Sequence, residues 1–466
     1  MTTTRPVSVH RPLTGGGLAV LLIAYAPVNF TFGSVNVLAE SIGRDLGAGS
    51  AGPQLVLSAY TTAFAASLLI AGRLGDRYGR RRMLTLGSAG VAMLSAATAF
   101  APDIASLVAV RVLLGIAAGL VTPQVLATIQ ATSRGAARSS GLMLFAAMSG
   151  VSTVLGQVLA GLVDSALDPH LGWRAVQIVT GLIALAGLVG LRFVPDSRVS
   201  EPLAMDGFGA SLLGGALLLI LVPLTLGPSS GWPLWSIAGM AAGAVLLVAF
   251  WVAQRRSEAR GLTPVVPPRV LRLSVIRTGL VMTVLFFLTY GAMLYELSAL
   301  ARARFGMGAL GASMLLLGFG AVFIATSALL PRILPDAGER TMAVAGVVQA
   351  AILAAIAVLA ATGNDDLGAL QFALIPLGAA QALMFGPVLN TVLSRAPGWA
   401  AGVASGLFTT VQQLGLSIGV AVLGGAFWAI AGPDGARMDA ALAAVFAVHA
   451  ACALVFAGLA RSLSRR

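Results

Sequence analysis

The sequence contains no lysine, only 17 acidic residues and a single cysteine. Charged residues make up 10% of its 466 positions, whereas hydrophobic types make up 58% and glycine adds 56 residues more. A soluble globular chain is about 45–50% apolar when glycine is counted, and this chain clearly exceeds that share. The composition therefore excludes ordinary water-soluble domains, and the low charge excludes a disordered chain. It indicates a protein whose solvent is largely a lipid bilayer.

Several kinds of chemistry are also missing. The sequence has no GxxxxGK[ST] phosphate loop and no stretch long enough for a separate soluble domain, which argues against direct coupling to ATP. Cys452 lies in an apolar run and is predicted to be a buried, inert thiol. The spacing of Asp164, Asp168 and His170 is weak evidence for a metal site, and no nucleophile motif is present. We therefore expect a protein that is not an enzyme, with no catalytic residue, no metal and no organic cofactor.

Long, uninterrupted apolar runs recur along the whole chain. A helix that crosses the bilayer needs about 20 mostly apolar residues, and these runs reach that length without the alternation of β-barrel strands. The pattern predicts an all-α integral membrane protein. Fourteen spans are predicted, at residues 17–38, 54–72, 84–101, 104–129, 140–163, 175–194, 208–226, 233–253, 278–301, 309–330, 342–361, 368–393, 402–430 and 440–460.

The arginines lie in short clusters between the apolar runs. A net charge of +12 could indicate nucleic-acid binding, but clusters of this kind are typical of cytoplasmic loops of membrane proteins. With the N-terminus inside, 23 of the 29 arginines fall in inner segments and Arg111 lies within a span. The remaining arginines are outer ones, namely Arg44, Arg174, Arg302, Arg304 and Arg437. We therefore predict that both termini are cytoplasmic and that nucleic acid is not a partner.

The segment between the second and third predicted spans, residues 72–82, reads GRLGDRYGRRR. Gly72 and Gly75 let one helix approach another closely, and Gly79 permits a tight turn. Asp76 can accept hydrogen bonds from an arginine fork or from the N-terminus of a helix, and so can lock two helix ends together. The residue types at this spacing therefore predict a latch between helices.

This segment resembles the cytoplasmic signature of the major facilitator superfamily. Residues 107–119, 149–162 and 400–424 resemble further segments of one branch, the fourteen-helix drug:proton antiporters. The resemblance implies two six-helix bundles with two additional helices. It divides the chain into an N-terminal bundle at 1–197, two inserted helices with a cytoplasmic linker at 198–272, and a C-terminal bundle at 273–466. It assigns a cytoplasmic gating role to Gly72, Gly75, Asp76, Arg77, Gly79, Arg80 and Arg81.

Four positions depart from the pattern of that family, and one of them is Glu40, which occupies the position of a proline. Leu114 stands where the fourth-helix motif usually has glutamine, and Gln157 stands where the fifth-helix motif has proline. In the first span, Thr31 occupies the position of a common aspartate. The usual acidic site of the first helix is therefore missing.

Two charged residues lie inside predicted spans, where a charge costs at least about 2.5–3.5 kcal/mol and is a functional candidate. The resemblance assigns Arg111, in the middle of the fourth span, to proton coupling; a structural pairing with a backbone carbonyl or an acid is the alternative. Glu296 lies in the outer half of the ninth span, where a carboxyl in an apolar wall can load a proton. The alternative is a helix-end acid neutralised by Arg302 or Arg304. Glu296 and Arg111 are the predicted proton-coupling residues.

Uncharged polar and aromatic residues in the spans are candidates for contact with a substrate. The alternative is that they form interhelical hydrogen bonds or pack in the core, as such residues often do in membrane helices. The candidates are Asn29, Asn36, Gln124, Gln157, Tyr290, Tyr295, Phe385, Asn390 and Gln412. His449, in the last span, is expected to be structural.

These features predict a secondary active exporter of small amphipathic compounds, driven by inward proton flow and working by alternating access around a site near the midplane. We expect a monomer in the cell membrane, with the proton as coupling ion and with small molecules and lipid as partners. By resemblance, the substrates are antibiotics or other natural products. A metabolite importer or uniporter is the first alternative. A membrane sensor or scaffold that transports nothing is the second.

Overall fold

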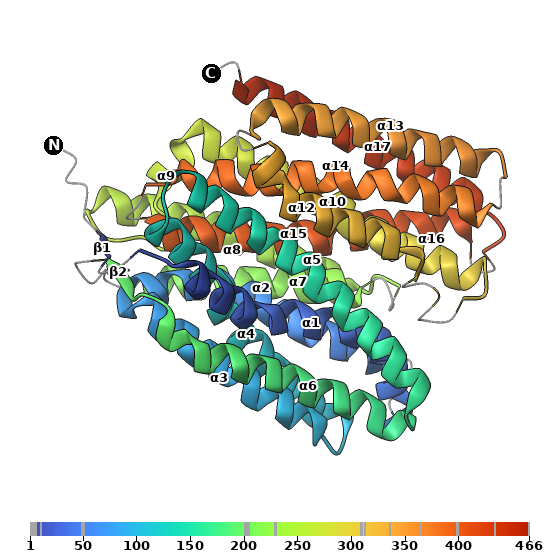
Figure 1. Ribbon diagram of the computed structural model, residues 1–466, viewed down its shortest axis with the longest axis horizontal. Coiled ribbons are helices and arrows are strands. Elements are labelled where there is room, and N and C mark those ends of the chain that lie inside the picture. The colour runs from blue at the N-terminus through green and yellow to red at the C-terminus, as the bar shows by residue number, and fades with distance from the viewer. Residues whose placement is uncertain are drawn as a thin grey trace. The chain divides into compact units, whose positions relative to one another are not determined.

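The computed structural model describes residues 7–9, 12–47, 52–199, 206–227, 231–307, 311, 314–334, 337–363, 366–397, 400–432 and 435–464. Most of these residues are helical (Figure 1). The helices are α1 (Gly15–Asp45), α2 (Gly52–Tyr78), α3 (Arg80–Ala99), α4 (Ile104–Thr132), α5 (Gly135–Ala166), α6 (Pro169–Gly190), α7 (Gly207–Leu226), α8 (Leu234–Ala259), α9 (Pro268–Arg272), α10 (Ser274–Ala303), α12 (Leu317–Ile333), α13 (Glu339–Ala361), α14 (Leu367–Ser394), α15 (Ala401–Gly419), α16 (Gly425–Ala431) and α17 (Met438–Ser464).

Four short elements accompany these helices. The 3-10 turn η1 (Leu191–Phe193) follows α6, and the π-helical turn η4 (Val420–Gly424) joins α15 to α16. Strands β1 (Val7–Val9) and β2 (Ser197–Val199) pair antiparallel. The two strands tie the start of the chain to the segment that follows α6.

The all-helical membrane architecture predicted from the sequence is confirmed. Twelve helices of the described residues are long and apolar enough to cross a bilayer by length and composition, α15 and α16 counting as one. The other two predicted spans fall on α3, which opens on three arginines, and on α12, which offers only the shorter apolar stretch Leu317–Leu330. Part of the predicted span 309–330 lies outside the described residues. The count of fourteen spans is therefore not confirmed.

The helices separate into two compact units. The first unit comprises Met1–Ile276 and Leu393–Thr410, and the second comprises Arg277–Val392 and Val411–Arg466. The first half of α15 thus belongs to the first unit and its second half to the second. The predicted division of the chain at residues 197 and 272 stays a prediction.

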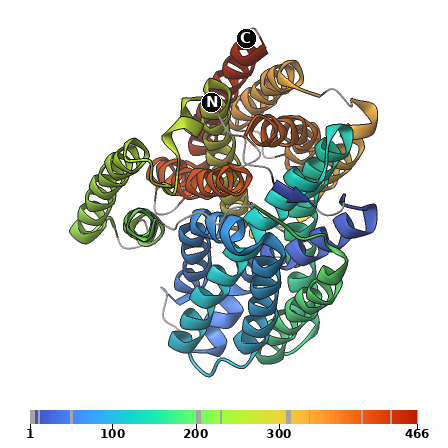
Figure 2. The same ribbon diagram turned by 90° about the vertical axis from the view of Figure 1, so that its left-hand side faces the viewer.

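Close helix packing builds the first unit. In it α2 packs against α4, α1 against α5, and α3 against α4 and α6. A side chain at Gly156 of α5 would meet the carbonyl oxygen of Phe30 on α1, and one at Gly115 of α4 would meet that of Tyr60 on α2. Small residues allow such approaches, which supply much of the attraction between helices in lipid. The pair α7 and α8 joins the unit through α7, which packs on α2, with α8 on its far side (Figure 2).

In the second unit, α13 and α17 lie side by side (Figure 1). Gly346 of α13 faces Ala453 and Ala457 of α17, so that small residues again meet at the contact. The apolar core around this pair also draws on α10, α12, α14 and α16. Its members include Leu297, Leu353, Leu377, Phe427 and Phe446.

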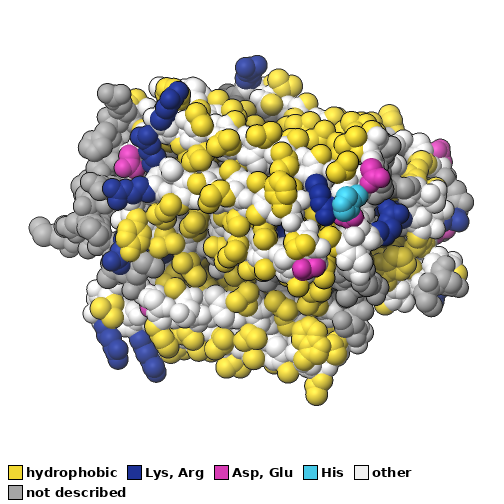
Figure 3. Space-filling model, turned by 90° about the horizontal axis from the view of Figure 1, so that it is seen from below, with side chains coloured by type: hydrophobic (Ala, Val, Ile, Leu, Met, Phe, Trp, Pro, Cys, Tyr) yellow, Lys and Arg dark blue, Asp and Glu magenta, His cyan; other side chains and the backbone are white. Residues whose placement is uncertain are grey.

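Large apolar side chains remain exposed along many helices. Met93 of α3 is 68% exposed, Val245 of α8 is 67% exposed and Phe372 of α14 is 78% exposed. On the face shown in Figure 3, hydrophobic side chains cover the middle, and arginines gather mainly toward the left-hand end. Soluble monomers rarely expose large contiguous apolar surfaces. These faces therefore fit a lipid environment.

A cluster around Asp45 ties the end of α1 to the start of α6. The Asp45 carboxylate accepts a hydrogen bond from the indole Nε1 of Trp173 at 2.9 Å and pairs with Arg174 and His170. Burial acts to raise the pKa of Asp45, but the hydrogen bonds from His170, Arg174 and Trp173 outweigh it and lower the pKa below its ordinary value. Trp173 itself is completely buried in the apolar core of the first unit.

Because its pKa is lowered in the folded protein, Asp45 is expected to stabilise the fold at neutral pH and to lose this effect in acid. A carboxyl of this kind stabilises the fold above its unfolded pKa of about 4, and the contribution is lost as the pH falls through the folded pKa. Thermal unfolding of the wild type and of Asp45→Asn in detergent, from neutral pH down to about pH 3, measures this. The wild type should be more stable at neutral pH, and the two should converge in acid. A difference that is constant with pH would contradict the assignment.

Candidate functional site

The motif at residues 72–82 covers the end of α2, the turn at Gly79 and the start of α3. Gly79 has a φ of +98°, a conformation that glycine adopts without strain, so it provides the predicted turn. A side chain at Gly72 would meet the carbonyl oxygen of Gly402, in the first turn of α15. The close helix approach that the glycines predict is therefore present, and the partner of α2 is α15.

Asp76 lies fully buried where these helices meet. Its Oδ1 accepts a hydrogen bond from Nη2 of Arg80 at 3.1 Å, and its carboxylate lies against Gly402. A negative charge is favoured at that place because the N-terminus of α15 carries partial positive charge. Arg80 is also buried and donates to the carbonyl oxygen of Ala127 at 3.2 Å and to the hydroxyl of Ser197 at 3.3 Å. One buried ion pair thus links α2, α3, α4, α15 and β2.

Gln124 of α4 closes the other side of the motif. Its Nε2 donates to the carbonyl oxygen of Ala71 at 2.6 Å, and a side chain at Gly75 would overlap its amide group. Gln124 is fully buried, so the structure gives this substrate candidate an interhelical hydrogen bond, which was the alternative role. At the edge of the motif, Arg77 lies over the ring of Tyr78, and Arg81 is half-buried.

A contact that the sequence did not indicate joins the motif to the connector between α8 and α9. Nε of Arg73 donates to the carbonyl oxygen of Val265 at 2.8 Å. Gln254, at the end of α8, accepts from the backbone N–H of Val266 at 2.9 Å and donates to Asp206 at 2.8 Å. The connector is thereby held by polar side chains of α2 and α8. No spacing in the sequence relates Arg73 to a partner 192 positions away.

Arg111 is buried in the first unit, with 1% of its surface exposed. Its Nε donates to the carbonyl oxygen of Val56 at 3.2 Å and its Nη1 to the hydroxyl of Thr31 at 3.1 Å, and its guanidinium lies 4.7 Å from the ring centre of Tyr60. Within the described residues no carboxylate is among its partners. Thr31 is the residue that replaces the common aspartate, so the departure from the family pattern leaves this buried cation with a neutral partner.

Glu296 is completely buried and pairs with His449 of α17. Its Oε2 lies 2.9 Å from Nε2 of the imidazole, which is also completely buried. Arg304 instead pairs with Asp439 at 3.7 Å. The nearest partner of Glu296 is therefore an imidazole that sequence analysis had treated as structural, because no local pattern connects residues 153 positions apart.

Two of the aromatic candidates meet in one cluster of the second unit. Phe385 of α14 stacks on Phe286 with ring centres 5.6 Å apart and meets Phe287 edge-on at 5.2 Å. Tyr290 stacks on Phe286 at 6.0 Å. The structure therefore brings Tyr290 and Phe385 together through two phenylalanines that the sequence analysis did not select.

The remaining substrate candidates lie apart from this cluster. Asn29 accepts from the hydroxyl of Ser149 at 3.1 Å, Asn36 donates to its own helix at Phe32, and Tyr295 accepts from the indole of Trp428 at 3.1 Å. Half-buried positions are occupied by Gln157, Asn390 and Gln412. Their roles in substrate binding stay predictions.

The sequence matches the model of a known family over most of its length. The Major Facilitator Superfamily model matches residues 21–212 and 201–420. The chain belongs to this superfamily. The family resemblance inferred from residues 72–82 is thus confirmed, and the protein is a multi-pass membrane transporter rather than an enzyme.

Individual members of the superfamily are similar to this chain. The protein named "Probable actinorhodin transporter" of Streptomyces coelicolor is 31% identical over 404 residues, which cover 85% of this chain and 70% of that one. The puromycin resistance protein pur8 of Streptomyces alboniger is 32% identical over 420 residues, covering 87% and 80%. The solved proton:xylose symporter XylE matches 95% of this chain and 94% of its own with a TM-score of 0.69, and at 15% identity this likeness concerns the fold alone.

Proposed function

We propose that this superfamily member exports small amphipathic natural products, antibiotics among them. One observation carries the proposal: two relatives that match 85% and 87% of the chain are named for actinorhodin transport and for puromycin resistance. Each is about a third identical to this chain over that length. We propose the same class of compound as the substrate of this protein, and we do not propose an individual compound.

The aromatic cluster around Phe286 supports this substrate class. Phe286, Phe287 and Phe385 are buried and contact one another by ring faces and edges, and half-buried Tyr290 adds a hydroxyl. Aromatic rings stack on planar apolar groups, and a few polar groups then orient the bound molecule. A compound with a ring system and polar substituents meets both requirements.

Inward proton flow is the proposed source of energy, with the proton as coupling ion and no other cofactor. Glu296 and Arg111 are the proposed coupling residues, since both are buried charges in apolar helices. The proposed setting is the cell membrane, with both termini cytoplasmic and one chain as the working unit. Residues 72–82 are the proposed gate on the cytoplasmic side.

Everted membrane vesicles test the export of puromycin directly. Vesicles that contain the chain and are acidified inside by respiration should accumulate puromycin, because the cytoplasmic face points outward. Vesicles without the chain are the control. Nigericin, which exchanges protons for potassium, should stop the accumulation if protons drive it.

The other outcomes separate the alternatives. Puromycin that leaves everted vesicles when the gradient is imposed indicates an importer, and equilibration without accumulation indicates a uniporter. The absence of flux for puromycin, actinorhodin and a panel of related aromatic antibiotics contradicts the proposal and favours a sensor or scaffold.

A further inference from the structure

Glu296 and His449 form a separate pair of titratable groups inside the second unit. The side-chain contact is 2.9 Å, and neither residue is exposed to any extent. The other polar atom of each, Oε1 of Glu296 and Nδ1 of His449, is buried with no hydrogen-bond partner among the described residues. Buried polar atoms normally have partners, so two such atoms on one pair require an explanation.

Among the described residues, the helices around the pair carry no other charged side chain in their interiors. The apolar core that surrounds it draws on α10, α12, α13, α14, α16 and α17. In the described part of these helices, charged side chains lie at or near the helix ends, and the interiors add only phenols and a thiol. The groups at or near the ends are Arg277, Arg302, Arg304, Arg332, Glu339, Arg340, Asp366, Arg395, Arg437, Asp439 and Arg461, and the interior groups are Tyr290, Tyr295 and Cys452.

The number of protons on the pair therefore decides its net charge. When a neutral His449 donates its Nε2–H to the Glu296 carboxylate, the pair carries a charge of −1, and Nδ1 keeps a free lone pair. One proton bound at Nδ1 forms an N–H bond and turns the pair into imidazolium and carboxylate, with no net charge. An uncompensated buried charge costs several kcal/mol, so binding of this proton is favoured.

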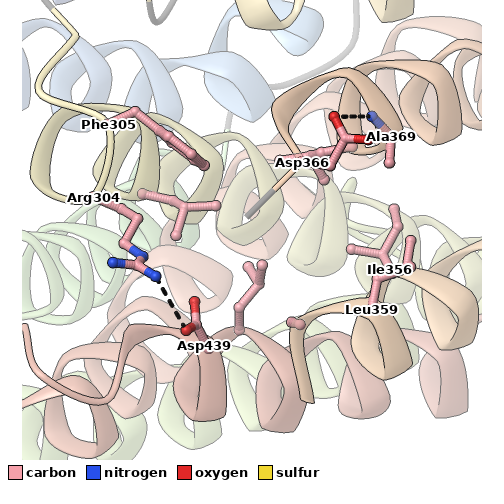
Figure 4. Close-up of a pocket in the computed structure, with 11 residues that line it drawn as sticks. Arg304, Phe305, Ile356, Leu359, Asp366, Ala369 and Asp439 are labelled. Atoms are coloured by element: carbon pink, nitrogen blue, oxygen red, sulfur yellow. Dashed lines mark hydrogen bonds and ion pairs between the residues drawn. The ribbon is translucent and has the colours of Figure 1, made fainter. Parts of the chain in front are cut away.

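A pocket lies at the ends of α10, α13, α14 and α17 (Figure 4). Arg304 and Asp439, which line it, are 40% and 39% exposed, so the pocket reaches solvent. Leu300, also in the lining, is one helical turn from Glu296, and Leu442 is two turns from His449. The arginine distribution predicts that this end of the helices is the outer one.

Two buried glutamines lie deeper on the same helices. Gln381 of α14 donates to the sulfur of Met293 at 3.9 Å, one turn from Glu296 on α10, and Gln349 of α13 is 1% exposed. The side-chain oxygen of each has no partner among the described residues. Such oxygens can accept hydrogen bonds from buried water, and water can relay a proton.

We propose that Glu296 and His449 hold the coupling proton together, and that it reaches them through the pocket lined by Leu300, Arg304 and Asp439. The inference rests on the proposed proton-driven export and adds His449 to the residues that carry it. His449 is then a proton-binding residue and the pocket is the external entrance of the proton.

The imidazole can be observed without any drug. Nitrogen NMR of the full chain, labelled in its 3 histidines and placed in lipid vesicles, reports the protonation of each ring. His449→Gln identifies the signal of His449. In the wild type this ring should gain a proton as the pH falls. In Glu296→Gln the signal of the protonated ring should be weaker at the same pH, because the neighbouring negative charge is gone.

Two further variants keep this experiment decisive. His170→Gln, which removes a histidine at the start of α6, should leave the His449 titration unchanged. If Glu296→Gln folds poorly, the exchanged pair, Glu296→His with His449→Glu, replaces it as the test. The imidazole of the exchanged pair should gain a proton as it does in the wild type. A His449 signal that titrates alike in the wild type and in Glu296→Gln, or an exchanged pair without a titrating ring, overturns the proposal.

Transport of puromycin in reconstituted vesicles separates the inference from the proposed function. Glu296→Gln and His449→Gln should each lose the dependence of export on the proton gradient, and the double variant should be no worse than either. A wild type that exports no puromycin defeats the proposed function, and the NMR titration then decides the pair by itself. Gradient-driven export that survives in both variants defeats the inference alone.

The entrance is tested with two variants that each carry one introduced cysteine in a Cys452→Ser background. Ala369→Cys lines the pocket, whereas Thr362→Cys is exposed at the same end of the helices and does not. A bulky charged thiol reagent added from outside should slow gradient-driven export, or proton uptake by His449, in the first variant only. Equal effects in both variants overturn the pocket as the entrance.

Discussion

Replacing Asp76 with asparagine is expected to lower the free energy of unfolding by about 3–5 kcal/mol, because it leaves a buried cation without its anion. Arg80 is 1% exposed and its ion-pair partner is Asp76, at 3.1 Å. The substitution also removes the negative charge that lies against the N-terminus of α15. Thermal or denaturant unfolding of the purified chain in detergent measures the loss, and puromycin export should fall with it.

A matched aspartate and a double variant control this experiment. Asp103 is exposed and caps α4, its Oδ1 accepting from the backbone N–H of Ser106 at 2.8 Å. Asparagine caps helices as well as aspartate does, so Asp103→Asn should change little. Asp76→Asn combined with Arg80→Gln removes both charges and should be more stable than Asp76→Asn alone. A double variant as unstable as the sum of the two single ones would show that the charges act independently.

Replacing Arg111 with leucine is expected to reduce export about tenfold or more, which is a change of about 1.4 kcal/mol or more in the transport barrier. The thermal stability of the variant should stay close to that of the wild type, because the contributions to it oppose one another. The variant loses hydrogen bonds from a charged donor, each about 1.5–3 kcal/mol, and a cation–π contact of about 0.5–2 kcal/mol. It also removes a charge whose burial in a span costs at least about 2.5–3.5 kcal/mol. Export and unfolding measured on the same preparation separate the two effects.

Two other substitutions sharpen the result for Arg111. Arg192 is an exposed arginine that lies over the ring of Phe193, and Arg192→Leu should leave export unchanged. Arg111→Lys keeps the charge but loses the planar fork that reaches both Val56 and Thr31. Its export should therefore lie between that of Arg111→Leu and that of Arg192→Leu. If Arg111→Leu unfolds readily while its folded fraction exports normally, the residue is structural.

The motif at residues 72–82 shows how far local spacing reaches. Asp76 and Arg80 are one helical turn apart, so an ion pair between them follows from the sequence alone. The turn at Gly79 also follows from the local sequence, because glycine adopts a φ of this kind without steric strain. Gly402, against which the carboxylate lies, is more than 300 residues away. The sequence allowed an arginine fork or a helix N-terminus as the partner of Asp76, and the packing brought the N-terminus of α15 to it.

Membrane character and family could be read from the sequence because both depend on local properties. The free energy of placing an apolar run in lipid is set by that run, and a signature such as GRLGDRYGRRR is one continuous segment. The partners of the buried charges could not be read in this way. Arg111 meets Thr31 across 80 positions, and Glu296 meets His449 across 153. Which face of a helix turns toward which neighbour is decided by packing along whole helices, and only the tertiary structure contains that information.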